Sequence, residues 1–169
     1  MKKFLLPLII CALLLVSCNG SGGEEANTSA QTNPPETTVT EAAPAEIDIN
    51  SLAADAVSKI SFGMTVEELS SDAVDYLYPG LPEGTEGVVY ATGGAGAEEL
   101  AVFRCSDGDA LSAVIESHRE DQRTAYASYK PEDVAKIDNA VTYRKGEYTV
   151  FCISSDHAEA KKVIEGLLG

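Results

Sequence analysis

The chain has 169 residues, with 27 acidic and 12 basic side chains and a formal net charge of −15 at pH 7. This charge excludes nucleic acid as an expected partner, because the phosphate backbone would be repelled. The length allows one domain of ordinary size beside shorter flanking segments.

The first 17 residues predict a bacterial signal peptide. Lys2 and Lys3 precede an apolar run over residues 4–16, which is shorter than the roughly 20 apolar residues that span a bilayer. The run ends in a match to the lipobox of bacterial lipoproteins, formed by Leu15, Val16, Ser17 and Cys18. This resemblance implies cleavage between Ser17 and Cys18 and a diacylglyceryl group on Cys18, which would hold the protein on the cell membrane, facing outside the cytoplasm. The alternative is an ordinary secretory signal with an incidental cysteine.

Residues 18–46 predict a disordered, acidic tether. After Cys18 this segment contains five Glu, three Pro and neither Lys nor Arg, and Val39 is its only large apolar residue. Such a composition buries too little apolar surface to offset the entropy of ordering. Loss of Lys2 and Lys3 with the signal peptide would leave a net charge of −17, which favours solubility outside the cytoplasm.

Residues 47–169 predict a single globular α+β domain. The spacing of apolar residues and the capping signals predict four helices. They cover residues 47–60 with Asn50 as the cap, a short segment from the Thr65–Glu68 capping box toward Leu77, residues 109–129, and residues 156–169 from an Asp156–Glu159 capping box. Alternating apolar residues predict two hairpins, over residues 88–91 and 100–105 around Gly93–Gly96, and over residues 141–144 and 148–153 around Lys145–Gly146.

Two halves of this domain resemble each other. Four apolar residues, Val102, Phe103, Val114 and Ile115, recur 48 or 49 positions later as Val150, Phe151, Val163 and Ile164. A duplicated β-β-α unit would explain this pattern, and chance similarity between two strand-to-helix junctions is the alternative. Either origin predicts a four-stranded, mainly antiparallel sheet with helices packed on one face, preceded by N-terminal helices.

Two cysteines remain in the domain, because Cys11 leaves with the signal peptide and Cys18 carries the lipid. Side chains alternate between the faces of a strand, so Cys105 shares a face with Phe103 and Cys152 lies opposite to Phe151. If both phenylalanines face the helices, the two thiols point to opposite sides of the sheet. This arrangement excludes a disulfide between them.

The ordered part of the chain resembles the lipoproteins of Gram-positive anaerobes that carry domain of unknown function 4358. The resemblance covers the chain after the tether and is carried by a series of short motifs. They are a leading Ile47-Asp48 helix, Tyr78 before a turn, Tyr90 before a glycine-rich loop, the run from Glu98 to Phe103, the run from Arg119 to Gln122, Tyr129-x-Pro131 and Lys145-Gly146-x-Tyr148. It implies a lipoprotein with a small α+β domain in the cell envelope, and it implies no activity.

The sequence contains no recognisable catalytic, metal or nucleotide motif. His118 and His157 are the only histidines, and there is no Gly-x-Ser-x-Gly, Cys-x-x-Cys or His-Glu-x-x-His sequence. No calcium loop of the Asp-x-Asp-x-Asp-Gly type occurs either. We therefore expect that the protein is not an enzyme and needs neither a metal nor a cofactor.

The predicted helix over residues 109–129 carries the most informative polar cluster. His118 and Gln122 fall in the middle of its apolar stripe, and Tyr129 falls at the end of the same stripe. A buried pair bonded to backbone groups is one interpretation, and a ligand groove lined by His118, Gln122 and Tyr129 is the other. The first favours a non-catalytic envelope domain that binds a protein or another envelope component. The second favours a small-molecule or substrate receptor with its pocket under this helix.

Overall fold

The computed structural model describes residues 46–169. The predicted signal peptide, the Ser17–Cys18 junction and all but the last residue of the predicted tether lie outside the described residues. No helix in the described part of the chain has the length and apolar character that a membrane span requires.

A five-stranded antiparallel sheet forms the centre of the domain, with the strand order β1-β2-β3-β5-β4. The strands are β1 (Glu67–Glu68), β2 (Glu86–Ala91), β3 (Glu99–Arg104), β4 (Val141–Lys145) and β5 (Tyr148–Ile153). The two predicted hairpins are confirmed as β2–β3 and β4–β5. The predicted number of four strands is wrong, because the short strand β1 pairs with β2 along the edge of the sheet.

Strand β1 occupies residues for which the Thr65–Glu68 motif predicts the start of a helix. The backbone N–H of Leu69 donates to the Val89 carbonyl at 2.8 Å, which continues the pairing with β2 beyond β1. The β-branched pair Thr65-Val66 suits this extended backbone. Helix α2 (Ser71–Leu77) begins only after Ser70, whose hydroxyl accepts a hydrogen bond from the Ala73 N–H.

The other helices follow the predicted positions closely. They are α1 (Ile49–Lys59), α3 (Gly108–Tyr129) and α5 (His157–Leu168). Asp48 caps α1, not Asn50 as predicted, because its carboxylate accepts from the Ser51 N–H at 2.9 Å. The sequence patterns missed a 3-10 turn (Pro131–Asp133) and the short helix α4 (Val134–Asp138) that follow α3.

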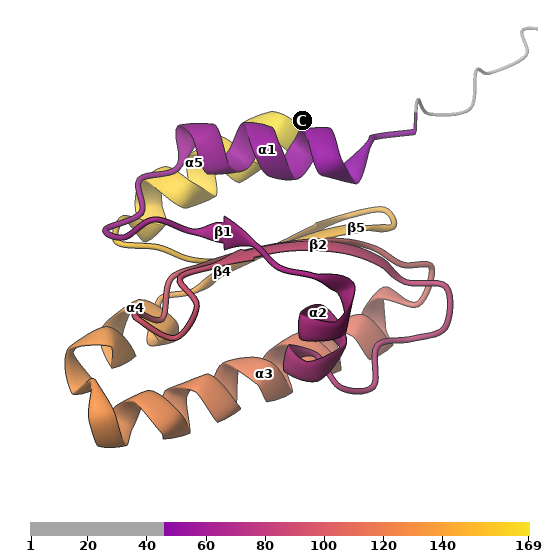
Figure 1. Ribbon diagram of the computed structural model, residues 1–169. Coiled ribbons are helices and arrows are strands. Elements are labelled where there is room, and N and C mark those ends of the chain that lie inside the picture. Colours follow the sequence, from indigo (N-terminus) through magenta and orange to yellow (C-terminus); the bar gives the residue numbers. More distant parts are fainter. Residues whose placement is uncertain (1–45) are drawn as a thin grey trace, which may run out of the picture. The chain divides into compact units, whose positions relative to one another are not determined.

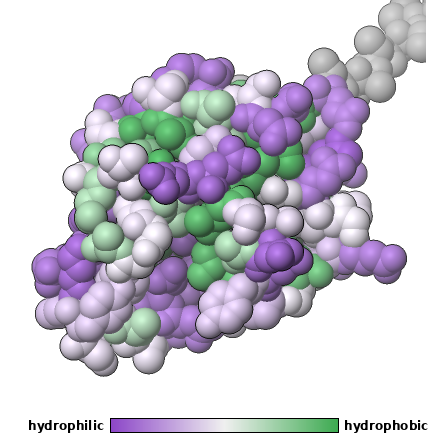
Figure 2. Space-filling model, in the orientation of Figure 1, coloured by the Kyte–Doolittle hydropathy of each residue, from purple (hydrophilic) through white to green (hydrophobic). Residues whose placement is uncertain are grey.

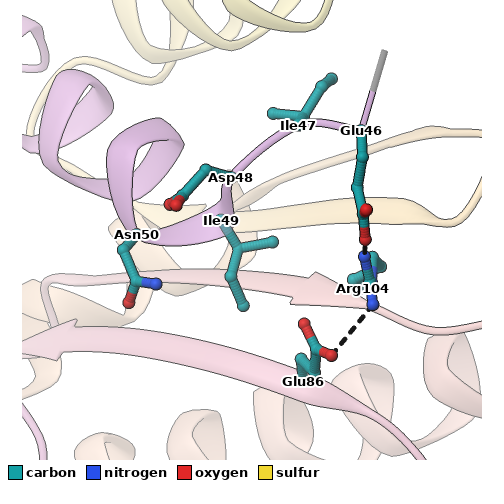
Figure 3. A pocket seen from close by; sticks show the side chains of 7 residues that line it. All are labelled: Glu46, Ile47, Asp48, Ile49, Asn50, Glu86 and Arg104. Carbon is teal, nitrogen blue, oxygen red and sulfur yellow. Dashed lines mark hydrogen bonds and ion pairs between the residues drawn. The ribbon is translucent and has the colours of Figure 1, made fainter. Parts of the chain in front are cut away.

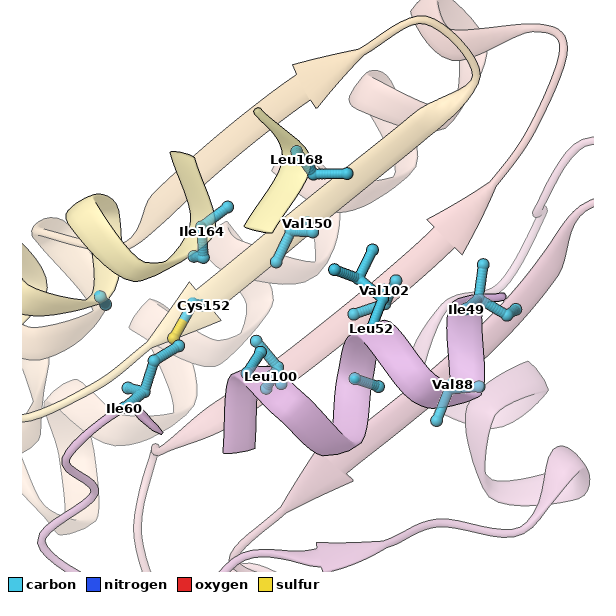
Figure 4. Close-up of a cluster of buried hydrophobic side chains, with 13 residues drawn as sticks. Ile49, Leu52, Ile60, Val88, Leu100, Val102, Val150, Cys152, Ile164 and Leu168 are labelled. Carbon is cyan, nitrogen blue, oxygen red and sulfur yellow. The ribbon is translucent and has the colours of Figure 1, made fainter. Parts of the chain in front are cut away.

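Helices cover both faces of the sheet (Figure 1), so the prediction that they share one face is wrong. Helices α1 and α5 cover one side, which we call the α1/α5 face. Helices α2, α3 and α4 cover the other side, which we call the α2/α3 face. Side chains of the central strands point alternately to the two faces. Val102 and Val150 pack under α1 and α5 (Figure 4). Phe103 and Phe151 pack under α3.

Strands β3 and β5 are related by a local two-fold arrangement, which agrees with the repeat of 48 residues. Val102 pairs with Val150 at the centre of the two strands, and Phe103 and Phe151 face the same side. The helices break this symmetry, because α3 and α5 begin 49 residues apart and lie on opposite faces. Both links from strand to helix contain three residues, so β5 continues one residue further than β3 relative to the repeat, and the last residues of the two strands point to opposite faces.

The two domain cysteines lie in different hydrophobic clusters. Cys105 belongs to the cluster on the α2/α3 face, and Cys152 belongs to the cluster on the α1/α5 face. Both are buried and free. The prediction from strand alternation is therefore confirmed.

Candidate functional site

Helix α3 carries the three residues that the sequence singled out, and the structure gives each a different environment. His118 is buried, Gln122 is half-buried, and Tyr129 is 58% exposed. The predicted buried stripe is therefore confirmed up to His118 and at Tyr126. Ala125 and Tyr129, which belong to the same predicted stripe, are exposed. The helix covers the sheet with its first half, and its second half borders open surface.

His118 forms a closed polar network in the core. Its Nδ1 lies 3.0 Å from the Leu77 carbonyl oxygen, and its Nε2 lies 3.0 Å from Oε2 of Glu99. Tyr78 donates its hydroxyl proton to Oε1 of Glu99, and its ring stacks on His118 with a centroid distance of 4.2 Å. Burial, followed by the nearby carboxylate of Glu99, raises the pKa of Tyr78 well above its ordinary value, so the phenol stays protonated.

The proton positions in this network follow from the partners. A carbonyl oxygen only accepts, so Nδ1 of His118 carries a proton and donates to Leu77. Nε2 of His118 lies within hydrogen-bond distance of Glu99, whose other oxygen accepts from Tyr78. His118 and Glu99 are only 4% and 2% exposed. Every polar atom of this pair that could react is thus committed to a partner inside the core.

Three adjoining hollows run along the α2/α3 face, and we call them together the α2–α3 trench. The middle hollow, of about 380 Å3, lies between α2, the β2–β3 hairpin and the second half of α3. A second, of about 370 Å3, extends over β1, and a third, of about 660 Å3, opens where α2 meets α3. Leu69 lines the first two, and Gln122 lines the first and the third, so the hollows adjoin one another.

Exposed apolar side chains collect in this trench. Three large hydrophobic residues are exposed within residues 46–169, namely Met64, Tyr76 and Tyr129, with Tyr76 at 84%. All three line the trench. Figure 2 shows hydrophobic surface in the middle of this view, crossed by a hydrophilic band and bordered by hydrophilic side chains. An exposed apolar and aromatic strip of this kind is typical of an interaction surface.

The charged residues that line the trench are all acidic. Glu67, Glu68, Asp75 and Asp121 are exposed on its walls, and neither Lys nor Arg lines any of the three hollows. Glu68 accepts a hydrogen bond from the Tyr90 hydroxyl at 3.0 Å. The other three carboxylates form no ion pair with the described part of the chain.

The wall formed by the β2–β3 turn is held to the end of α3. Gly93 and Gly94 adopt positive φ angles of 62° and 86°, which explains the glycines at this turn. Lys130 donates to the Ala95 carbonyl at 2.9 Å, and Tyr126 donates to the Gly96 carbonyl. The turn is therefore a hairpin connection, as the sequence predicts.

A second buried carboxylate, Glu98, joins the two layers at one end of the sheet. Its oxygens accept from the N–H groups of Gly63 and Met64 at 2.9 and 2.8 Å, from Ser155 at 2.8 Å and from Lys136 at 3.1 Å. Burial alone would raise the pKa of Glu98, but these hydrogen bonds outweigh it and hold the pKa below its ordinary value. We regard Glu98 as a structural residue, because four donors from three segments of the chain bind its carboxylate.

A further hollow lies beside the start of α1 (Figure 3). Its only cation, Arg104, is paired with Glu46 and, at 2.9 Å, with Glu86. This pairing leaves Arg104 unable to serve as a free anion-binding group. Within the described residues, no group of three or more His, Cys, Asp or Glu side chains could hold a metal ion.

Sequence patterns did not identify most of the trench. Among its residues, the sequence had singled out Gln122 and Tyr129 for a groove, together with His118 at its edge. The position of Tyr76 offers one signal. Val74 in α2 and Tyr78 directly after α2 are buried, and Tyr76 lies on the side of this short helix that faces solvent.

Residues 59–154 match the model of a family described as Domain of unknown function (DUF4358). This match covers more than half of the chain and contains every residue of the trench, but it leaves out most of α1 and all of α5. It is therefore shorter than the predicted resemblance, which began at Ile47. No curated protein and no solved structure gives a match.

Proposed function

The chain belongs to the DUF4358 family, and we propose that it is a lipid-anchored, extracytoplasmic binding module without catalytic activity. In this proposal the α2–α3 trench contacts a protein or another component of the cell envelope. The observation that carries it is the collection of Met64, Tyr76 and Tyr129 in one trench, because these are the exposed large hydrophobic residues of the described domain. Exposed aromatic residues at a polar-rimmed patch are common at the centre of binding interfaces.

The lipid anchor in this proposal rests on the lipobox that ends at Cys18. The tether joins the domain at Glu46, just before α1, and α1 belongs to the α1/α5 face. The trench lies on the other face of the sheet. Substitution of Cys18 by Ser should abolish incorporation of a labelled fatty acid, and persistent label in the variant would contradict the anchor.

A site-specific photo-cross-linking experiment tests the binding role. A photoreactive phenylalanine analogue replaces Ala125, which is exposed in the trench, in otherwise unmodified cells. The matched control places the same analogue at Ala54, an exposed alanine of α1 on the other face. We expect a discrete cross-linked product from position 125, not from position 54, and its loss in the Cys18→Ser background. Equal products from both positions, or none, would refute the proposal.

A receptor for a small molecule is the second candidate. The middle hollow of about 380 Å3 supports it, because Gln122 and Tyr129 bring an amide and a phenol to an otherwise apolar wall. Native mass spectrometry of the protein purified from its host separates the two candidates. A bound compound of constant mass, lost in a Gln122→Ala variant, would favour the receptor, whereas a ligand-free protein that still cross-links at position 125 would favour the binding module.

A further inference from the structure

We propose that the occupant of the α2–α3 trench is an extended, basic segment of a partner protein that also carries aromatic or aliphatic side chains. This inference rests on the proposed binding function and adds the chemistry of the partner. It starts from the shape of the site. The three hollows follow one another along β1, α2 and the second half of α3 and remain open to solvent, which suits a strand-like chain better than a compact ligand.

The charge of the walls selects the sign of the partner. Glu67, Asp75 and Asp121 are exposed and have no cationic partner among residues 46–169. A positively charged segment would gain attraction at each of these carboxylates, and an acidic segment would be repelled. The same repulsion disfavours a second copy of this chain, whose net charge is −15, and an anionic membrane surface.

The aromatic residues of the trench indicate which side chains the partner segment carries besides its positive charges. Tyr76 and Tyr129 both line the middle hollow, one from α2 and the other from α3. Tyrosine rings offer a π face to a Lys or Arg side chain and flat apolar area to an aromatic or aliphatic one. With acidic residues beside them, these rings favour a segment in which basic and apolar side chains alternate.

The absence of tryptophan from the sequence gives a direct assay. The probe is a synthetic peptide of three Lys-Trp-Gly repeats with blocked ends, and its tryptophans are the only ones in the mixture. Titration with the purified chain should shift the tryptophan emission to shorter wavelength with saturation. A peptide with Glu in place of each Lys, and another with Ala in place of each Trp, should bind at least about five-fold more weakly.

Two double variants with the same change in net charge separate a specific site from general attraction. Asp75→Asn with Asp121→Asn removes two trench carboxylates and should raise the Kd about five-fold. Asp55→Asn with Glu147→Gln removes two exposed carboxylates that line none of the three hollows and should leave the Kd within about two-fold. All four positions are exposed, so circular dichroism should show the same fold for both variants.

The outcomes are distinct for this inference and for the proposed function. Equal weakening in both double variants, or equal binding of the Glu peptide, would overturn the assignment of a basic partner. Failure of the Lys-Trp-Gly peptide to bind, together with a cross-linked product at position 125, would overturn this inference and leave the binding function standing. Failure of both experiments would overturn both.

Discussion

The two faces of the sheet are covered in different ways. On the α1/α5 face, two helices of similar length pack on a cluster whose buried members are all apolar or cysteine. On the α2/α3 face, the 22-residue α3 and the seven-residue α2 share the cover, with the His118–Glu99–Tyr78 network between them. The short α2 does not reach along the second half of α3, which is contacted instead by α4, through Arg123 and Asp138 at 2.8 Å, and by the β2–β3 turn. The face with the shorter helix thus holds both the His118–Glu99–Tyr78 network and the trench.

The largest effect should come from removing the polar centre of the α2/α3 face. His118→Ala leaves Glu99 and the Leu77 carbonyl without their partner in the core. We expect the free energy of unfolding to fall by about 3 to 5 kcal/mol, as for other broken buried pairs. Gln122→Ala should change it by less than about 0.5 kcal/mol, because Gln122 lines the trench. Urea denaturation of both variants measures this difference, and equal losses would show that Gln122 belongs to the core.

A smaller loss is expected where the two layers meet, at Glu98. Its pKa is lower in the folded than in the unfolded protein, because Gly63, Met64, Lys136 and Ser155 donate to it. Glu98 therefore stabilises the fold fully above the unfolded pKa, and this contribution is lost as the pH falls through the folded pKa. Glu98→Gln should lower the free energy of unfolding by about 2 kcal/mol at pH 7.

The pH dependence provides the control for Glu98. The difference between the wild-type protein and Glu98→Gln should begin to shrink once the pH falls below the unfolded pKa of glutamate. It should vanish only after the pH has passed through the lower folded pKa, where both side chains are uncharged. Glu147→Gln, at an exposed position of the β4–β5 turn, should follow the wild-type curve throughout. A pH-independent difference at Glu98 would mean that its charge does not contribute.

Two glycines, one associated with each face, should respond to alanine in opposite directions. A Cβ atom on Gly87 would lie 2.7 Å from ring carbons of Phe103, which packs under α3. Gly87→Ala should therefore lower the free energy of unfolding by about 1.5 kcal/mol. Gly166, in α5, has nothing within 4 Å of such an atom, and Gly166→Ala should raise it by about 0.5 kcal/mol. Thermal melts that move in the same direction would contradict the packing of Phe103 on Gly87.

Thr149 offers a way to stabilise the α2/α3 face. Its hydroxyl is buried beside Phe151 on this face and has no hydrogen-bond partner in the described chain. Thr149→Val replaces the hydroxyl by a methyl group of similar size and should raise the free energy of unfolding by about 1 kcal/mol. A lower melting temperature would mean that the hydroxyl has a partner, such as a bound water molecule.

The smallest expected effect concerns the thiols. Burial raises the pKa of Cys152 to about 12, so its thiolate is scarce at neutral pH. Alkylation of the native protein should leave both Cys105 and Cys152 unmodified, and both should react after unfolding without reductant. Mass spectrometry checks this result. A mass two units below that of the reduced chain would indicate an intramolecular disulfide and contradict their location on opposite faces.

The sequence was most informative where an element is long or where strands alternate regularly. The 22 residues of α3 contain enough turns for the apolar period to identify its ends and its buried position at His118. The alternation in β3 and β5 correctly separated the two cysteines. Short elements were less predictable. The Thr65–Glu68 motif and Ser70 can each cap a helix, but the pairing of Leu69 with β2 keeps the residues before Ser70 out of a helix.

The trench could not be predicted, because it depends on how α2 lies against α3. Each helix pattern reports only which of its own residues are apolar, whereas the contact between Leu77 and His118 fixes the position of α2. Gln122 and Tyr129 could be proposed from α3 alone, but Asp75 and Tyr76 become part of the same site only in the folded chain. The side on which α5 lies was equally hidden, since the repeat predicted the same side for both helices.

The shared central strands also determine how the domain can open. Val102 and Phe103 are neighbours in β3, yet their side chains belong to the hydrophobic clusters on opposite faces of the sheet. The neighbours Val150 and Phe151 in β5 are divided between the two clusters in the same way. Each of these strands is hydrogen-bonded along both edges. Neither layer can separate from the sheet's centre without exposing apolar surface of the other, so the two cores should melt as one cooperative unit. We expect local fluctuations at the two edge strands, β1 and β4, and at the exposed turn at Gly93–Gly94, and of these β1 and the turn border the trench.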